Sequence, residues 1–166
     1  MKQLLSFLTI IIGLLSCTSS AHNKESELLA IGKKYMEAVE TKNVDLMDSL
    51  LSSNYIGYGP SVGDSTNKDG ALASFKYNAE NLYESFVYTR HKELAVTVTE
   101  GVGIGDWVLN WAHLTIKYKD GRGPINLWVN AIYRVEDGKI VESRTFYNEA
   151  DALRQLGYSF VPPASK

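Results

Sequence analysis

The sequence predicts an α+β domain in which N-terminal helices pack on one face of a curved antiparallel β-sheet. Two observations lead to this prediction. Apolar residues recur at helical spacing in the first part of the chain, whereas from Phe86 to Tyr147 they alternate with polar residues, as strands require. Asp120-Gly121 and Asp137-Gly138 separate the alternating segments, and Asp-Gly pairs favour tight hairpins.

The first residues are typical of a secretory signal. Lys2 precedes an apolar run from Leu4 to Leu15, which is shorter than the roughly 20 residues that a membrane span needs. The run leads into Ser16-Cys17, and Leu-Leu-Ser-Cys resembles the lipobox of bacterial lipoproteins, whose cysteine is lipidated and becomes the new N-terminus. An ordinary signal peptide with an incidental cysteine is the alternative.

The lipobox resemblance implies a signal peptide over residues 1–16, lipidation at Cys17 and a tether over residues 17–24. The protein is then expected in the cell envelope, anchored to a membrane and facing the periplasm. Contact with the membrane is expected from the lipid alone, because several acyl chains suffice for stable anchoring. Since Cys17 is the only cysteine, no disulfide or cysteine nucleophile is expected in the folded domain.

Composition limits the class of protein. The part of the chain after the signal peptide suits one domain, expected over residues 25–157, with room for a core and a pocket. The net charge is −2 and both signs are interspersed, so no nucleic-acid partner is expected. The three histidines, His22, His91 and His113, are not spaced as metal ligands, and neither a metal site nor a cofactor is predicted.

Three helices are expected ahead of the main sheet. Residues 25–40 place apolar side chains on one helical face. Asn43 is the expected N-cap of a second, shorter helix. Asp69 is the expected cap of a third helix that reaches about residue 84.

One short strand is expected between the second and third helices, and the other strands follow the third. Residues 61–68 are polar and contain glycine, so they are expected to form a loop. A last helix over residues 149–156 precedes a tail over residues 158–166. The expected strands are residues 55–60, 86–99, 107–118, 125–135 and 140–147.

Two stretches resemble a known superfamily. Residues 35–46 (YMEAVETKNVDL) resemble the opening of the cone-shaped nuclear transport factor 2-like superfamily. Residues 133–142 (YRVEDGKIVE), with residues 153–157 (LRQLG), are similar to the end of its SnoaL-like branch. The resemblance spans residues 25–157 and implies the fold. It does not imply one activity, because this fold hosts isomerases, dehydratases, cyclases, transport adaptors and pure binding domains.

Ketosteroid isomerase, an enzyme of this superfamily, allows a comparison by residue. Tyr35 falls where that enzyme has its oxyanion-binding tyrosine. The aspartate base falls on Gly59, and the second, protonated aspartate falls on Ala131. Proton abstraction next to a carbonyl needs a base within about 3 Å of the proton, which glycine and alanine cannot supply. Steroid-isomerase chemistry by that mechanism is therefore not expected.

The same alignment, extended by strand alternation, assigns the faces of the strands. One parity of residues 125–135 is wholly apolar or aromatic and is expected to face the inside of the cone. The cone is then mostly apolar with a few polar groups, which is typical of a site for a small molecule. The predicted ligand-binding residues are Tyr35, Tyr55, Asn110, Ser143, Thr145 and Tyr147.

The opposite parity places an aromatic and polar group on the convex face. Homodimers of this fold commonly pack sheet against sheet there, and interfaces are rich in aromatic residues and arginine. A single β-bulge would reverse the parity and send His113 and Arg144 into the cone. The predicted dimer interface consists of Trp111, His113, Trp128, Asn130, Arg144 and Phe146.

The catalytic candidates are Tyr35, His113 and Tyr147. His113 suits a general base, because histidine side chains exchange protons near neutral pH. An interface role is favoured for it, since no carboxylate lies at a spacing that would orient the ring. Residues 101–105 (GVGIG) follow a strand but precede no helix, so a hairpin is favoured there over a phosphate-binding loop.

The functional hypothesis is a lipid-anchored envelope protein that binds a small apolar or amphipathic molecule in its cone. One alternative is a lyase, cyclase or isomerase acting on a small carbonyl or polyketide-like compound. A second alternative is a protein-interaction module, which predicts an occluded cone and exposed aromatic residues on the convex face.

Overall fold

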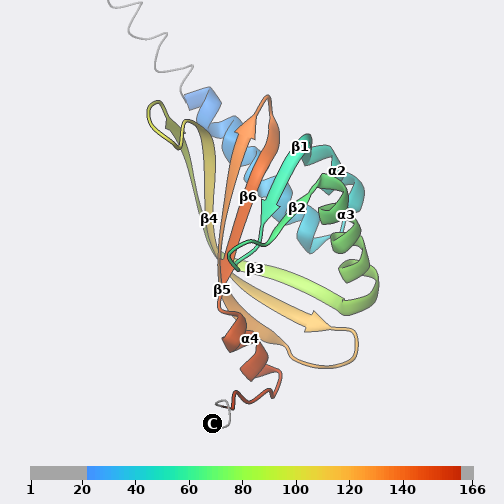
Figure 1. Cartoon of the computed structure of the whole chain (residues 1–166). Coiled ribbons are helices and arrows are strands. Elements are labelled where there is room, and N and C mark those ends of the chain that lie inside the picture. Colours follow the sequence, from blue (N-terminus) through green and yellow to red (C-terminus); the bar gives the residue numbers. More distant parts are fainter. Residues whose placement is uncertain (1–21, 162–166) are drawn as a thin grey trace, which may run out of the picture.

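The computed structural model describes residues 22–161. The expected signal peptide and the lipidation site at Cys17 lie outside the described residues. The first helix spans residues 22–40. The elements that follow it are α2 (Val44–Leu50), β1 (Leu51–Tyr58), β2 (Ser65–Asn67), α3 (Lys68–Tyr77), the π-helix η1 (Asn78–Leu82), β3 (Tyr83–Val98), β4 (Gly105–Tyr118), β5 (Ile125–Glu136), β6 (Lys139–Tyr147) and α4 (Glu149–Gln155), as Figure 1 shows.

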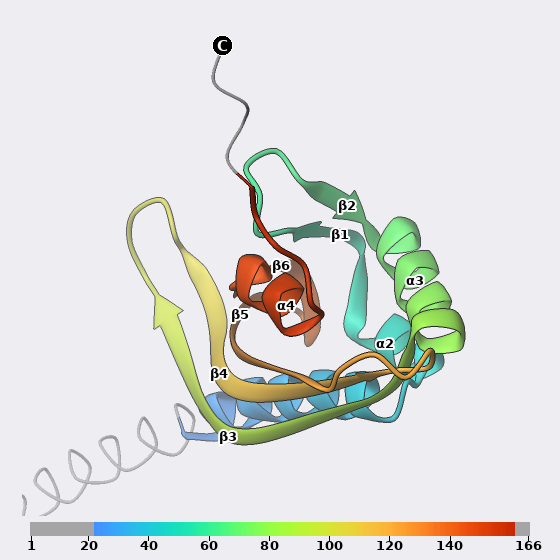
Figure 2. The same ribbon diagram turned by 90° about the horizontal axis from the view of Figure 1, so that it is seen from below.

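Six strands form one strongly curved sheet in the order β2-β1-β6-β5-β4-β3. The helices lie on its concave side, and in Figure 2 α4 lies inside the curve of the sheet. The predicted α+β fold is confirmed. The sheet is mixed rather than wholly antiparallel, because β1 pairs in parallel with β6. Parallel neighbours need a long crossover connection, and the chain from β2 to β5 supplies it.

The helix caps decide where α2 and α3 begin. The Asn43 side chain accepts a hydrogen bond from the Leu46 N–H at 2.9 Å, as predicted. The predicted Asp69 cap is wrong, since Asn67 caps α3 by accepting from the Gly70 N–H at 2.9 Å. The third helix also ends earlier than predicted, because pairing of Tyr83 with the end of β4 draws this stretch into the sheet.

Two differences concern the first strands. β1 begins at Leu51, directly after α2, rather than at residue 55. The stretch 61–68 is not all loop, because Ser65–Asn67 pairs with the end of β1 as β2. All three residues of β2 are exposed, so the strand has no apolar alternation by which the sequence could reveal it.

The apolar core divides into two clusters at a β-bulge in β3. Thr89 pairs with His113 and Lys92 with Trp111, which leaves Arg90 and His91 opposite a single residue of β4. Arg90 adopts a positive φ of 51°, and a bulge of this kind bends the strand and increases its twist. The upper cluster, which includes Leu28, Val108 and Tyr133, lies under the first helix. The lower cluster, which includes Leu114, Ile125 and Ala152, lies against α4.

The bulge leaves the predicted parity of β4 intact. β4 and β5 pair without a break from Asp106 opposite Val135 to Ile116 opposite Ile125. Alternate residues of both strands are buried, as the alternation predicts. His113 therefore lies on the convex face.

The first helix approaches the sheet closely at Gly32. A Cβ at this position would lie 2.9 Å from Glu93 Oε1 and 2.9 Å from Val108 Cγ1, so only glycine fits there without a shift. Among residues 22–161, none of the helices has the length and apolar character needed to cross a membrane.

Candidate functional site

A cavity of about 310 Å³ lies in the lower half of the sheet, and we call it the aromatic pocket. Strands β3 to β6 form its walls and α4 closes one side. The lining residues are Tyr83, Phe86, Tyr88, Leu114, Ile116, Tyr118, Ile125, Leu127, Val129, Thr145, Tyr147, Glu149, Ala152, Leu153 and Leu156.

Local contacts fix α4 as the wall of this pocket. Asn148 caps the helix by accepting from the Asp151 N–H at 3.0 Å. The Gln155 side chain makes two hydrogen bonds with the backbone at the start of β5, one as donor and one as acceptor. Its amide donates to the Asn126 carbonyl at 2.9 Å, and its side-chain oxygen accepts from the Asn126 N–H at 2.8 Å. Ala152 is buried against the lower cluster, so the helix is held at its beginning, middle and end.

Three of the polar residues that line the aromatic pocket lie where β6 meets α4. Thr145, Tyr147 and Glu149 lie within five positions of one another and all line the cavity. Burial raises the pKa of Tyr147, and the Glu149 carboxylate adds to this. Burial, followed by Tyr83, raises the pKa of Tyr118 to about 12. Both phenols therefore stay protonated at ordinary pH and can donate hydrogen bonds.

The aromatic pocket carries one carboxylate, that of Glu149, and no Lys, Arg or His side chain lines it. Arg122 lies near it, 5.1 Å above the ring centroid of Tyr118. Its guanidinium is paired with Asp120 at 2.7 Å, which offsets its charge. Within residues 22–161 no group of three His, Cys, Asp or Glu side chains is arranged to hold a metal ion.

A second hollow, of about 420 Å³, lies between β1, β2 and β6, and we call it the tyrosine hollow. Thr145 lines both cavities. The residues of the tyrosine hollow are Tyr35, Tyr55, Gly57, Tyr58, Gly59, Asp64, Ser65, Thr66, Ser143 and Thr145.

In the tyrosine hollow, Gly57 leaves space for the Tyr55 side chain. The Tyr55 ring lies over Gly57, where a Cβ would come within 2.5 Å of the Tyr55 hydroxyl. This position brings the hydroxyl to 2.6 Å from Ser143 Oγ on β6. The Tyr35 ring packs on Tyr133 with 4.7 Å between centroids. Burial, followed by the nearby tyrosines, raises the pKa of Tyr35, so its hydroxyl is a hydrogen-bond donor rather than a base.

The tyrosine hollow also holds a carboxylate that the sequence did not reveal. Asp64 lies in the loop between β1 and β2, where its N–H donates to the Ser61 carbonyl at 3.2 Å. A Cβ at Gly59 would lie 3.3 Å from Asp64 Oδ2, so the carboxylate lies where a side chain at position 59 would begin. Residues in a loop follow no periodic pattern, so the sequence does not show where the Asp64 carboxylate lies. Its position follows from the close approach of Gly59 and Asp64 at the two ends of the loop.

The six predicted ligand-binding residues do not share one cavity. Tyr35, Tyr55 and Ser143 line the tyrosine hollow, Tyr147 lines the aromatic pocket, and Thr145 lines both. Asn110 lies outside both. Its amide donates to Met36 Sδ at 3.1 Å and to Glu93 Oε1 at 3.3 Å beneath the first helix.

The three catalytic candidates are also separated. Tyr35 and Tyr147 line different cavities, and His113 lies on the convex face. His113 Nδ1 lies 3.3 Å from Thr89 Oγ1, and its ring stands edge-on to Trp128 with 5.6 Å between centroids. A single reaction centre cannot use all three.

The sequence did not identify the aromatic residues of β3 as part of a site. Tyr83 was expected in a helix, and a register shift after it puts Tyr83 and Phe86 on the same side of the sheet. Their rings lie 4.9 Å apart. The alternation of Phe86 and Tyr88 is the one signal in the sequence that could have found this wall of the pocket.

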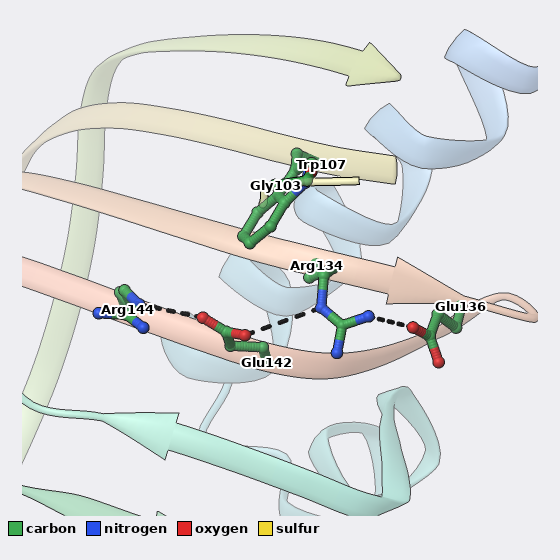
Figure 3. Close-up of polar contacts among 6 residues, drawn as sticks. All are labelled: Gly103, Trp107, Arg134, Glu136, Glu142 and Arg144. Carbon is green, nitrogen blue, oxygen red and sulfur yellow. Dashed lines mark hydrogen bonds and ion pairs between the residues drawn. The ribbon is translucent and has the colours of Figure 1, made fainter. Parts of the chain in front are cut away.

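The predicted interface residues lie together on the convex face. Trp111, Trp128 and Phe146 are exposed there. The Arg144 guanidinium lies 4.4 Å from the ring centroid of Tyr58. The Arg144 Nε also donates to Glu142 at 3.0 Å (Figure 3). Asn130 donates to the Asn110 carbonyl at 3.1 Å. An aromatic surface next to a fixed arginine is therefore present.

Comparisons with known proteins agree with this architecture. The LEH-like epoxide hydrolase of M. tuberculosis has a TM-score of 0.63 at 16% identity, covering 80% of this chain and 91% of that chain. A Bacillus subtilis protein to which isomerase activity is ascribed has a TM-score of 0.63 at 15% identity, covering 82% and 97%. IdmH from Streptomyces antibioticus, for which polyketide cyclase activity is suggested, has a TM-score of 0.57 at 20% identity, covering 77% and 99%. At these identities the likeness concerns the fold alone.

The sequence comparisons give the family. A comparison with curated proteins finds no match. The family model of the SnoaL-like domain matches residues 33–143, which is more than half of the chain. Together with the curved sheet and its helices, this match shows that the chain belongs to the SnoaL-like domain family, within the nuclear transport factor 2-like superfamily.

Proposed function

We propose that this domain binds a small amphipathic molecule in the aromatic pocket. The observation that supports the proposal best is a mostly apolar cavity of about 310 Å³ in whose lining Thr145, Tyr147 and Glu149 lie close together. Sites for small molecules are commonly apolar cavities with a few convergent polar groups. A protein-interaction module predicts an occluded cone and exposed convex aromatic residues. The convex aromatic residues are present, but the cavities on the concave side favour a small ligand.

The charge of the lining indicates which ligands fit. Glu149 is the one carboxylate in the aromatic pocket, and the rings of Phe86 and the tyrosines present faces that attract cations. An anionic ligand would meet the Glu149 carboxylate without a lining cation to offset it. The ligand is therefore an apolar molecule whose polar end is an amine or a neutral group.

The test compares three probes of one size: a benzylamine, the corresponding benzyl alcohol and the corresponding benzoate. We expect the amine to bind about fivefold more tightly than the alcohol, which corresponds to about 1 kcal/mol for a cation over aromatic rings and beside a carboxylate. Glu149→Gln should abolish this preference and leave the affinity for the alcohol unchanged. Binding is measured by chemical-shift titration.

Asp45→Asn is the matched control for Glu149→Gln. Both residues are acidic and lie in the first turn of a seven-residue helix, but only Glu149 lines the pocket. The control should keep the preference for the amine. Shifts confined to residues outside the aromatic pocket, or tighter binding of the benzoate, would show the proposal to be wrong.

A second candidate function is proton transfer in the tyrosine hollow, as in an isomerase, lyase or cyclase acting on a carbonyl compound. It is supported by Asp64, whose carboxylate lies beside Gly59, the position at which the resemblance to ketosteroid isomerase leaves a base missing. Tyr35 and Tyr55 line the same hollow and could bind the enolate oxygen, while Asp64 takes the proton from the neighbouring carbon.

The second candidate is tested by deuterium exchange at the carbon next to the carbonyl of small cyclic ketones. Asp64→Asn and Tyr35→Phe should each lower the rate at least tenfold, because a positioned base contributes roughly 10² to 10⁴-fold. Asp69→Asn, an exposed acid at the start of α3, should have no effect. An exchange rate equal to that in buffer would rule this function out.

A further inference from the structure

The hairpin between β3 and β4 exposes apolar side chains at its tip. Val102 is fully exposed, and Ile104 is 59% exposed. A Cβ at Gly101 or Gly103 would meet nothing within 4 Å, so the tip stands clear of the rest of the domain. The Ile104 N–H donates to the Gly101 carbonyl at 3.3 Å, which closes a turn.

An apolar groove of about 310 Å³ continues from this tip along the outer face of the sheet. Trp107 lies in the groove, and its indole N–H donates to the Gly103 carbonyl at 2.7 Å. This bond fixes the indole beside the tip. Tryptophan is favoured at the boundary between membrane and water, where its ring lies at the level of the lipid headgroups. The groove residues are Val96, Val98, Gly103, Trp107, Leu109 and Ile132.

The hairpin lies beside the start of the first helix. The Lys24 ammonium, near the start of the first helix, is paired with Asp106 Oδ1 at the base of the hairpin at 2.8 Å. Figure 1 shows the start of this helix next to the hairpin. Cys17, the predicted lipidation site, is five residues before residue 22 in the sequence.

At this end of the molecule the basic side chains Lys24 and Arg134 are paired with acids, and Glu100, two residues before Val102, adds an exposed carboxylate. Lys24 is paired with Asp106, and Arg134 contacts both Glu136 and Glu142. The face next to the groove therefore has no surplus of positive charge that would select anionic lipids. Its attraction for a membrane is apolar.

We propose that the β3–β4 hairpin is a second membrane contact, which inserts Val102 and Ile104 into the bilayer that holds the lipid on Cys17. The lipid brings the tip to the surface, and the exposed apolar side chains then leave water. Contiguous apolar surface of this kind is uncommon on a protein that stays in water. The contact fixes the orientation of the domain, which a lipid on a tether cannot do alone.

The test uses the mature lipidated protein, which begins at Cys17, in vesicles of neutral phosphatidylcholine. Because Cys17 is the only native cysteine, Val102→Cys introduces a single thiol for a nitroxide label. We expect the label at position 102 to be several-fold more accessible to oxygen, which concentrates in the bilayer, than to a water-soluble nickel complex. The preference should not change when anionic lipid is added.

Val62→Cys is the matched control. Val62 is also fully exposed, but it lies in the loop between β1 and β2, away from the hairpin. The label there should show the accessibility of a group in water. Equal accessibility at positions 102 and 62 would overturn the proposal. Uptake of label by the unsubstituted protein would overturn it too, because it would show that Cys17 carries no lipid. Neither result bears on ligand binding in the aromatic pocket.

Discussion

Gly57 is a glycine because the Tyr55 side chain occupies the space that a Cβ would need. We expect Gly57→Ala to displace the Tyr55 hydroxyl from Ser143 and to lower the free energy of unfolding by about 1 to 3 kcal/mol, as overpacking does. Urea denaturation measures the change. Gly103→Ala is the control, because its Cβ meets nothing within 4 Å, and it should cost less than about 0.5 kcal/mol. Equal losses would contradict this account of Gly57.

Tyr88 makes the stability of the fold depend on pH. Burial, followed by the Glu40 carboxylate, raises the pKa of Tyr88 to about 12, so the folded state holds the proton more tightly than the unfolded state. The contribution is complete below about pH 10 and is lost as the pH rises to about 12, and it amounts to roughly 2 kcal/mol.

Urea denaturation across this pH range should show the loss, and Tyr88→Phe should make it smaller. Some loss should remain, since burial also raises the pKa of Tyr35 and of Tyr133. An unchanged loss in Tyr88→Phe would show that the Tyr88 hydroxyl does not take part.

At the scale of single residues, alternation predicted which side chains are buried, but not which groups they contact. It placed Asn110 on the buried side, but it could not show that the amide binds Met36 and Glu93. Alternation could not find Asp64 either, because Asp64 lies in the loop between β1 and β2, where residues do not alternate, and only the course of this loop places it in the tyrosine hollow. Periodicity gives the face on which a residue lies, and only the folded structure gives its partners.

Among the elements, α4 links stability to binding. We expect Asn148→Ala to remove the cap of α4 at a cost of about 1 kcal/mol, to fray the wall of the aromatic pocket and to weaken ligand binding severalfold. Asn43→Ala removes the cap of α2, which lines neither cavity, and should cost a similar amount of stability without weakening binding. Unfolding and titration with the benzylamine probe, measured on both variants, separate the two effects. Equal affinities would show that α4 does not shape the site.

Elements with a periodic signal were predicted, and elements that depend on a distant partner were not. Strands β4 to β6 and α4 were placed nearly as observed, since turn residues bound each of them. β2 was missed, because its exposed residues form a strand only through pairing with β1. The parallel pairing of β1 with β6 joins segments far apart in the sequence, and nothing local indicates it.

At the scale of the whole molecule, the convex face remains the predicted dimer interface. We expect the protein to sediment as a homodimer at micromolar concentration, because Trp111, Trp128 and Phe146 are exposed together beside Arg144. Trp128→Asp should shift the mass towards that of the monomer, while Val62→Asp should not. A monomeric mass for the unsubstituted protein would show the prediction to be wrong. The apolar groove adjoins this interface, because Leu109 and Ile132 lie next to Trp111 and Asn130 on the same face, whereas Val102 and Ile104 at the tip of the hairpin lie outside it.

The β3–β4 hairpin and α4 lie at opposite ends of the same strands. β4 alone has 14 residues, which is about 46 Å of strand at 3.3 Å per residue before its curvature is considered. If the hairpin rests in the membrane, the sheet acts as a spacer that keeps the aromatic pocket away from the lipids. The ligand would then arrive through the aqueous compartment, and a molecule dissolved in the bilayer would have no sideways route into the cavity.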